Sequence, residues 1–258
     1  MALFLYWQDN KINITTINFQ NKKIPKKFNG FRILQVSDIQ NKKFGSKQSY
    51  LLNCMKKTLP DIIIITGDLI DCNRTNIERT IHFIEKAVKI APIYYVSGNH
   101  EYCSGRYKEI MQFLEEKGVT LLENKKTLLQ KDEEYMELLG ISDKKLSPNY
   151  RGELKKLTLD KKDSFKILLS HRPENFDAYV QAKIDLSFTG HAHGGQIRIP
   201  FIGGLFAPNQ GFFPKYTSGL YKKDGYSMIV SRGLGNSIFP FRIFNQPELV
   251  LVILNGKE

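Results

Sequence analysis

The sequence predicts an α/β sandwich whose sheets are at least partly parallel. Short apolar runs alternate with segments of helical periodicity along most of the chain. Four consecutive isoleucines at 62–65 indicate a strand that is buried on both faces. Polar turns follow one predicted strand after another. Strands that alternate with helices in this way are typical of α/β proteins.

The strands are expected where short apolar runs occur. Before residue 190 these runs lie at 33–36, 62–65, 93–96, 166–169 and 184–188. Two more strand-like runs follow at 228–230 and 249–254. Alternating apolar and polar residues at 12–19 predict a strand with one exposed face.

Helices are expected between these strands. Helical spacing of apolar residues predicts helices over 51–59, 74–90 and 104–118, with another that begins at Pro173. Thr75 and Glu78 form a capping box for the second of these helices, and Ser104 is expected to cap the third.

The composition favours one folded unit. The chain has 258 residues, of which 41% are hydrophobic and 25% charged, which suits one large core and excludes a disordered chain. Neither a repeat nor a linker divides it. We therefore expect a single domain over 1–258, in which 1–30 form an N-terminal strand extension. The apolar start at 1–7 is either a short edge element or the stub of a trimmed membrane anchor.

The net charge of +12 favours an anionic partner, such as a phosphate ester, a nucleic acid or a membrane surface. The lysines occur in scattered pairs and not in one basic stripe, which disfavours nucleic acid and a nuclease activity. Three cysteines are too few for a disulfide framework, and none lies in a Cys-x-x-Cys pair typical of zinc sites. No apolar run reaches the roughly 18 residues that span a bilayer.

Residues with metal-binding chemistry follow five of the predicted strands. They are Asp38, Asp68, Asn99 with His100, His171, and His191. One such residue after a strand is typical of a turn. Five in succession indicate a shared pocket, because ligands gather at the carboxyl ends of strands in open α/β sheets. Oxygen and imidazole donors suit Mn, Fe, Zn or Mg, and two bridged ions would hold both oxygens of a displacement at phosphorus.

The order and spacing of these motifs, over residues 31 to about 255, resemble the calcineurin-like metallophosphoesterases. The motifs are Asp38-x-Gln40, Gly67-Asp68-x-x-Asp71, Gly98-Asn99-His100-Glu101, His171 and Gly190-His191-x-His193. Gly194-Gly195-Gln196 and the tail at 199–244 resemble a bacterial membrane-associated subgroup, which includes the YkuE type and relatives of UDP-diacylglucosamine pyrophosphatases. The resemblance implies two sheets in a sandwich flanked by helices, with a dimetal centre.

The resemblance also implies roles for individual residues. The first metal would be bound by Asp38, Gln40 and His193, with Asp68 bridging to a second metal held by Asn99, His171 and His191. A hydroxide bridging the two ions would attack phosphorus. His100 would bind no metal, and would stabilise the transition state or protonate the leaving oxygen. Asp71 and Glu101 would either support these ligands or act as plain turn and cap residues.

Gln40 stands where the family usually has a histidine. Its carbonyl oxygen can bind a metal, but it is a harder and weaker ligand than imidazole. We therefore expect a looser first site that prefers Mn or Mg over Zn, unless Gln40 fails to reach the metal. Among the candidate ions, Mn is expected first, with Mg, Fe and Zn as alternatives.

The expected activity is hydrolysis of a phosphodiester, a pyrophosphate or a phosphomonoester. The aromatic tail after residue 194 is either a loop that covers itself or an apolar rim suited to a lipid or cell-envelope substrate. A lipid-linked substrate, peripheral membrane contact, and a membrane-associated or cytoplasmic location all stay open. Arg172, Arg198 and Arg232 are candidates for holding a non-reacting phosphate. The alternative is a metal-poor binding scaffold on the same fold, which would not need His100.

Overall fold

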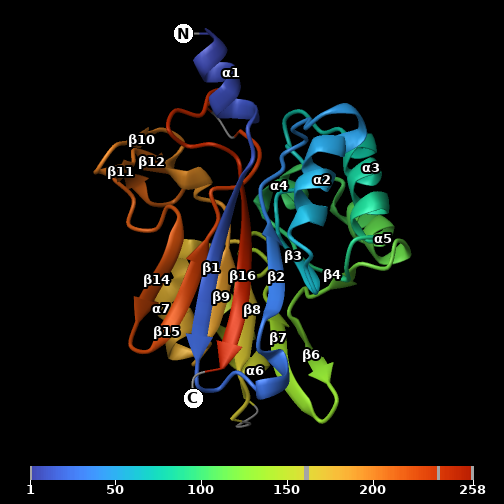
Figure 1. Ribbon diagram of the computed structural model, residues 1–258, viewed down its shortest axis with the longest axis vertical. Helices are drawn as coiled ribbons and strands as arrows, with labels where there is room; N and C mark the ends of the chain where they lie inside the picture. The colour runs from blue at the N-terminus through green and yellow to red at the C-terminus, as the bar shows by residue number, and fades with distance from the viewer. Residues whose placement is uncertain (1, 160–162, 237–238, 257–258) are drawn as a thin grey trace.

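The computed structural model describes all residues except 1, 160–162, 237–238 and 257–258. It consists of two six-stranded sheets that pack face to face, with helices on their outer sides (Figure 1). In order across the first sheet lie β1 (Asn13–Asn21), β16 (Glu248–Gly256), β2 (Phe31–Val36), β3 (Ile62–Thr66), β4 (Ile93–Val96) and β5 (Thr120–Leu121). The second contains β14 (Gly219–Lys223), β15 (Tyr226–Val230), β9 (Leu186–Thr189), β8 (Lys166–Leu169), β7 (Glu134–Gly140) and β6 (Lys125–Lys131).

Both sheets are mixed. Strands β2, β3, β4 and β5 run parallel, and β16 joins β2 in the antiparallel direction. In the second sheet β7, β8, β9 and β15 run parallel, whereas β6 and β14 add antiparallel edges. Two small antiparallel ladders complete the strands: β10 (Arg198–Ile199) with β11 (Gly203–Gly204), and β12 (Phe206–Ala207) with β13 (Gly211–Phe212).

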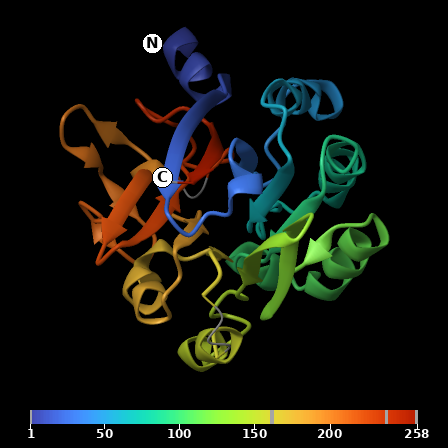
Figure 2. The ribbon, with the colours of Figure 1, turned by 60° about the horizontal axis from the view of Figure 1, so that its bottom comes forward.

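The helices lie on the outer faces of the two sheets, apart from the N-terminal one, which projects from one end of the molecule (Figure 1 and Figure 2). They are α1 (Ala2–Asn10), α2 (Ser49–Lys57), α3 (Ile77–Ala87), α4 (Asn99–Cys103), α5 (Tyr107–Glu116), α6 (Tyr150–Leu157) and α7 (Phe176–Gln181). Short 3-10 turns lie at Lys26–Phe28, Ser46–Gln48, Pro173–Asn175 and His193–Gly195. Helices α2, α3 and α5 pack on the first sheet, and α6 and α7 on the second.

The isoleucine run of β3 explains how the layers are held together. Ile62 and Ile64 point into the core between the sheets, where they join Ile167 and Phe188 from the second sheet. Ile63 and Ile65 point the other way, into the core beneath α2, α3 and α5. Because side chains alternate along a strand, an all-apolar strand is what a sheet covered on both faces requires. The predicted α/β sandwich is confirmed.

Each strand expected from the sequence is present, but three details differ. Residues 2–10 form helix α1 and not an edge strand, while Met1 lies outside the described residues. Helix α3 is capped by Asn76, whose side chain accepts the Arg79 N–H, and not by Thr75. Ser104 does not begin α5, because it ends α4 and its hydroxyl accepts the Arg106 N–H.

Candidate metal centre

The site lies where the carboxyl ends of both sheets meet, at the end of the molecule that also carries α1 (Figure 1). The buried side chain of Gln35 joins the sheets there. Its amide nitrogen donates to the hydroxyl of Thr66 at 3.0 Å and, across the sandwich, to the carbonyl of Thr189 at 2.9 Å. Loops that follow strands of different sheets are thereby kept in register.

The loops present their polar side chains from an unusual backbone. Five of the predicted ligands have left-handed backbone geometry, although none is a glycine: Asp38 (φ 51°), Gln40 (46°), Asp68 (53°), His191 (64°) and His193 (46°). Such conformations are uncommon for residues with a side chain and cluster at functional sites. The tight turns aim these side chains toward one another at the ends of the strands.

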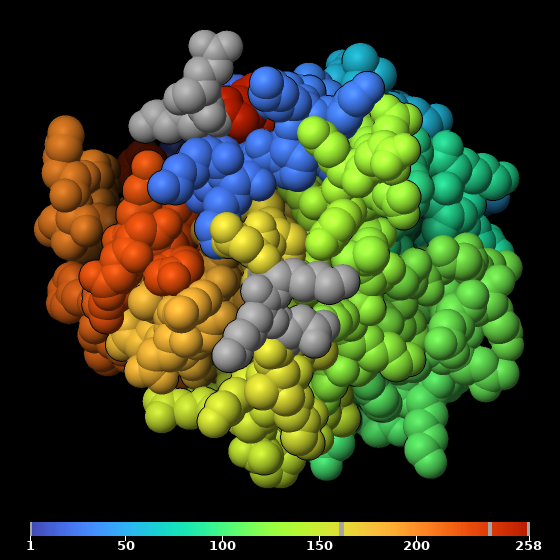
Figure 3. Space-filling model, turned by 90° about the horizontal axis from the view of Figure 1, so that it is seen from below, coloured from blue at the N-terminus to red at the C-terminus, as the bar shows by residue number. Residues whose placement is uncertain are grey.

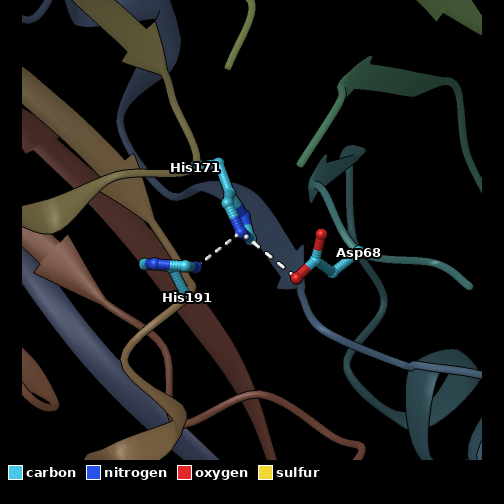
Figure 4. Close-up of side chains that lie close together, drawn as sticks. All are labelled: Asp68, His171 and His191. Atoms are coloured by element: carbon cyan, nitrogen blue, oxygen red, sulfur yellow. Dashed lines mark hydrogen bonds and ion pairs between the residues drawn. The ribbon is translucent and has the colours of Figure 1, made fainter. Parts of the chain in front are cut away.

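One group of ligands consists of Asp68, His171 and His191 (Figure 4). Nε2 of His171 lies 3.3 Å from a carboxylate oxygen of Asp68 and 3.0 Å from Nδ1 of His191. Nδ1 of His171 donates to the Thr66 carbonyl at 2.8 Å, because a carbonyl can only accept. The ring of His171 therefore keeps Nε2 directed at the other two ligands.

The second group shares Asp68 and adds Asp38 and His193. Nε2 of His193 lies 3.4 Å from Oδ1 of Asp38. The amide of Gln40 enters the same group, with Nε2 3.2 Å from Nε2 of His193 and 3.5 Å from Asp68. The side chain of Gln40 therefore lies beside His193 and Asp68, two of the predicted ligands.

Three buried polar atoms at this site lack a hydrogen-bond partner among the described residues. They are Oε1 of Gln40, Oδ1 of Asn99 and Nδ1 of His193. Buried polar atoms are normally satisfied, so unpaired ones at a cluster of ligands are expected where an ion binds. Asn99 also lines a cavity together with His191, which places it beside the first group.

The charged and ionisable side chains of the cluster shift one another's pKa values. Burial alone would raise the pKa of Asp68, but His171, His100 and His191 hold that pKa well below its usual range. Burial disfavours a charged His171, yet the Asp68 carboxylate raises the pKa of His171 to about 10. Burial and the nearby cations keep the pKa of His191 well below its usual range. An ionised carboxylate and a neutral imidazole are the forms that bind metals, so Asp68 and His191 are in the form that binds, whereas His171 must lose its proton to bind an ion.

His100 stands at the edge of the cluster. Its Nδ1 accepts the backbone N–H of Cys72 at 3.1 Å, so a neutral ring carries its proton on Nε2. That Nε2 lies 3.9 Å from Asp68, and Nδ1 lies 3.8 Å from Asp71. Asp71, Cys72 and His100 also form a third group of potential ligand atoms within 4.8 Å of one another.

Asp71 and Glu101 both support loops. Asp71 accepts the backbone N–H of Asn73 at 2.9 Å, which stabilises the turn after β3. The carboxylate of Glu101 is buried and accepts backbone N–H groups from Asp68, Leu69 and Gly98. Burial and the Asp68 charge raise the pKa of Glu101 to about 7, although these N–H groups oppose the shift.

The three candidate arginines lie in different surroundings. Arg172 is buried and forms a bidentate ion pair with Asp143, while its Nη1 lies 2.8 Å from Nε2 of His191. Arg198 donates to the Gly194 carbonyl at 3.0 Å. The guanidinium of Arg232 lies 3.5 Å from Glu248. Of the three, Arg172 is the one that the structure places against a ligand of the cluster.

Sequence motifs missed two asparagines that fix the histidine loop. Oδ1 of Asn209 lies 2.9 Å from Nε2 of His191 and accepts from Arg172 at 2.6 Å. The amide of Asn245 donates to the carbonyls of His193 at 2.7 Å and Gln196 at 2.9 Å. Both asparagines come from the tail after residue 194, where neither periodicity nor spacing marks them.

Comparisons with known proteins all find phosphoesterases or a related hydrolase. The profile of the calcineurin-like phosphoesterase family matches residues 31–195. The chain is 30% identical to the uncharacterised metallophosphoesterase YkuE of Bacillus subtilis, over 97% of this chain and 88% of the relative. It is 26% identical to the phosphodiesterase YaeI of Escherichia coli, over 87% and 82% of the two chains. Phosphopantetheinyl hydrolase from Mycobacterium tuberculosis shares the fold, with a TM-score of 0.50 and 13% identity over 80% of this chain and 91% of that one.

Proposed function

The chain belongs to the calcineurin-like phosphoesterase family and is a hydrolase of ester bonds, and on this premise we propose that it cleaves phosphoesters with two divalent ions. The observation that carries the proposal is the position of Asp68, which belongs to two of the three groups of potential ligand atoms among the described residues. One carboxylate common to two such groups suits a pair of neighbouring ions.

The residues divide into two sets around this carboxylate. The first ion would be held by Asp38, Gln40, Asp68 and His193, and the second by Asp68, Asn99, His171 and His191. The donors are oxygen and imidazole nitrogen, which suit Mn best among the candidates, with Mg, Fe and Zn as alternatives. When bound, such ions polarise phosphoryl oxygens and make water a stronger nucleophile.

His100 supplies the proton for the leaving group in this proposal. The Cys72 N–H occupies its Nδ1, which leaves a proton on Nε2, the atom that faces the cluster. A positioned histidine of this kind typically contributes about 10²- to 10⁴-fold to the rate. A carboxylate oxygen of Asp71 lies 3.8 Å from Nδ1 of His100, on the side of the ring away from the cluster.

The test is metal-dependent hydrolysis of an aryl phosphodiester and of the matching monoester. Protein stripped of metal is supplied with Mn, Mg or Zn, and His100→Ala is compared with His82→Ala, which removes a histidine from the outer helix α3. We expect turnover that requires metal, falls at least about a hundredfold in His100→Ala and is unchanged in His82→Ala. Failure of every metal, including with Gln40→His, would instead support a binding scaffold. The ratio of diester to monoester rates narrows the substrate class.

Peripheral contact with an anionic membrane is the second part of the proposal, and exposed apolar residues near the site support it. Helix α1 leaves Leu3 86% and Tyr6 70% exposed. The ring of Phe4 contacts the exposed Phe244 with ring centroids 5.7 Å apart, which extends the apolar surface toward the tail. Tyrosine and tryptophan favour the membrane interface, and the net charge of +12 favours anionic lipid. Within the described residues, no helix is long and apolar enough to cross a bilayer.

The single tryptophan, Trp7, reports on this contact because it lies in α1. Phosphatidylglycerol vesicles should shift its fluorescence to shorter wavelength, whereas phosphatidylcholine vesicles should have little effect. Combined Leu3→Ser and Tyr6→Ser changes should abolish the shift. Leu128→Ser, which alters an exposed leucine of β6, should leave it intact. An unchanged spectrum with anionic vesicles would refute membrane contact through α1.

A further inference from the structure

A cavity of about 300 Å³ opens beside the proposed ligands of the second ion. Its lining residues are Asn99, Lys144, Lys145, Arg172, His191, Pro208 and Asn209. Since Asn99 and His191 are among the proposed ligands, a group bound in the cavity would be attached close to the reacting phosphorus. The volume is at the lower end for small-molecule sites, which favours a compact group over a long chain.

The charged side chains that line this cavity are all positive. Three of its lining side chains are cationic, and none of the described lining residues is acidic. Two of the cations already have partners. Arg172 is paired with Asp143, and the Lys144 ammonium lies 3.3 Å from Glu174.

Lys145 differs from its neighbours. No acidic side chain lies within ion-pair distance of its ammonium among the residues that the structure describes, and the side chain is exposed. Its backbone, however, is fixed. The Lys145 N–H donates to Asp143 at 2.9 Å, and Asp143 holds Arg172, which contacts His191. A continuous set of contacts therefore keeps this lysine at a constant place relative to the proposed metal ligands.

We propose that Lys145 binds a second anionic group of the substrate, a phosphate or a carboxylate carried by the substituent next to the scissile phosphorus. This inference rests on the proposed hydrolase function and adds a preference to it. An uncharged substituent would leave Lys145 without a counter-charge, whereas an anionic one would form a charge-assisted hydrogen bond with it. Lys144 also lines the cavity, and Arg172 contacts His191 from the same wall.

The test compares three compounds that bind without being hydrolysed. Ethylphosphonate carries one anionic group, 3-phosphonopropionate adds a carboxylate, and ethylene-1,2-diphosphonate adds a second phosphonate. Calorimetry on the Mn-loaded protein should give about tenfold tighter binding for at least one of the last two, as expected for a hydrogen bond to a charged group. Comparing these two compounds identifies whether the second group is a carboxylate or a phosphate.

Lys145→Gln should remove this preference and leave the affinity for ethylphosphonate unchanged. Lys145→Arg should keep the preference, because it retains the charge. The matched control is Lys155→Gln in α6. This helix lies at the opposite end of the molecule from the site, the end that Figure 3 shows. If the affinity for ethylphosphonate is the same with and without Mn, the hydrolase proposal is overturned, and this inference with it. Mn-dependent binding with equal affinities, or a preference that survives Lys145→Gln, would overturn this inference alone.

Discussion

The carboxylate of Glu101 accepts the backbone N–H of Asp68 at 2.9 Å, although Glu101 lies in helix α4 and Asp68 in the loop after β3. It also accepts N–H groups from Leu69 at 2.6 Å and Gly98 at 2.8 Å. The loop after β3 presents Asp68, the carboxylate common to two of the potential ligand groups, and the first turn of α4 presents Asn99 and His100. The buried Glu101 side chain therefore holds the segment after β3 against the segment after β4, and both segments carry predicted ligands.

At a pH above the Glu101 pKa of about 7, Glu101→Gln should destabilise the protein by about 3 kcal/mol, because a neutral amide replaces a charged acceptor of several buried N–H groups. The amide would also direct its own N–H₂ toward some of those donors. The measurement is chemical denaturation of the metal-free protein. Glu109→Gln is the control, since Glu109 pairs with Arg106 on the exposed face of α5, and it should leave the midpoint unchanged. Equal midpoints for the two variants would show that Glu101 does not hold the loops.

Gly67→Ala should also separate the segment after β3 from the segment after β4, because the added methyl group would collide with Gly98. Gly67 has φ +88°, and a Cβ there would lie 2.5 Å from the Gly98 nitrogen and 2.8 Å from Nδ1 of His171. Gly105 has φ +70° with no atom within 4 Å of such a Cβ, so Gly105→Ala adds backbone strain alone, about 1–2 kcal/mol. We expect Gly67→Ala to lower the melting temperature much further and to abolish metal-dependent turnover. Similar melting temperatures for Gly67→Ala and Gly105→Ala would contradict this prediction, because they would show that moving Gly67 away from Gly98 does not destabilise the protein.

The sequence predicted the parts of the fold in which local pattern and tertiary role agree. The isoleucines of β3 are apolar because both faces are covered, and the ligand loops follow such strands. The β6–β7 hairpin was not predicted, because its leucine, lysine and glutamate residues favour helix and its turn at Asp132 (φ 54°) lacks glycine. Pairing with β8 overrides that preference. The contacts of Asn209 with His191 and Arg172 could not be predicted, because they depend on how the tail after residue 194 folds back, and no local sequence pattern indicates that.

Arg172→Lys tests whether this arginine positions His191 or binds substrate. Lysine cannot make the bidentate contact with Asp143, and its shorter head group would leave His191 without the contact at 2.8 Å. We expect Mn affinity to fall about tenfold, as for other residues that orient ligands, with KM for an aryl phosphodiester that carries no second anionic group unchanged at saturating Mn. The measurements are Mn titration by electron paramagnetic resonance and steady-state kinetics. A raised KM with unaltered Mn affinity would favour direct substrate binding.

Gln40→His should shift the metal preference of the first site toward Zn. The Gln40 amide already lies 3.2 Å from Nε2 of His193, so an imidazole at this position is close enough to add a nitrogen ligand. The left-handed backbone at residue 40 does not oppose the change, because histidine tolerates that region better than most residues. Since Zn favours imidazole over an amide oxygen, its affinity should rise by about tenfold, and Mn affinity by less. Competition with a chromophoric chelator measures both constants. Gln112→His, on the exposed face of α5, controls for an added histidine, and equal Zn affinities for the two variants would place Gln40 outside the metal site.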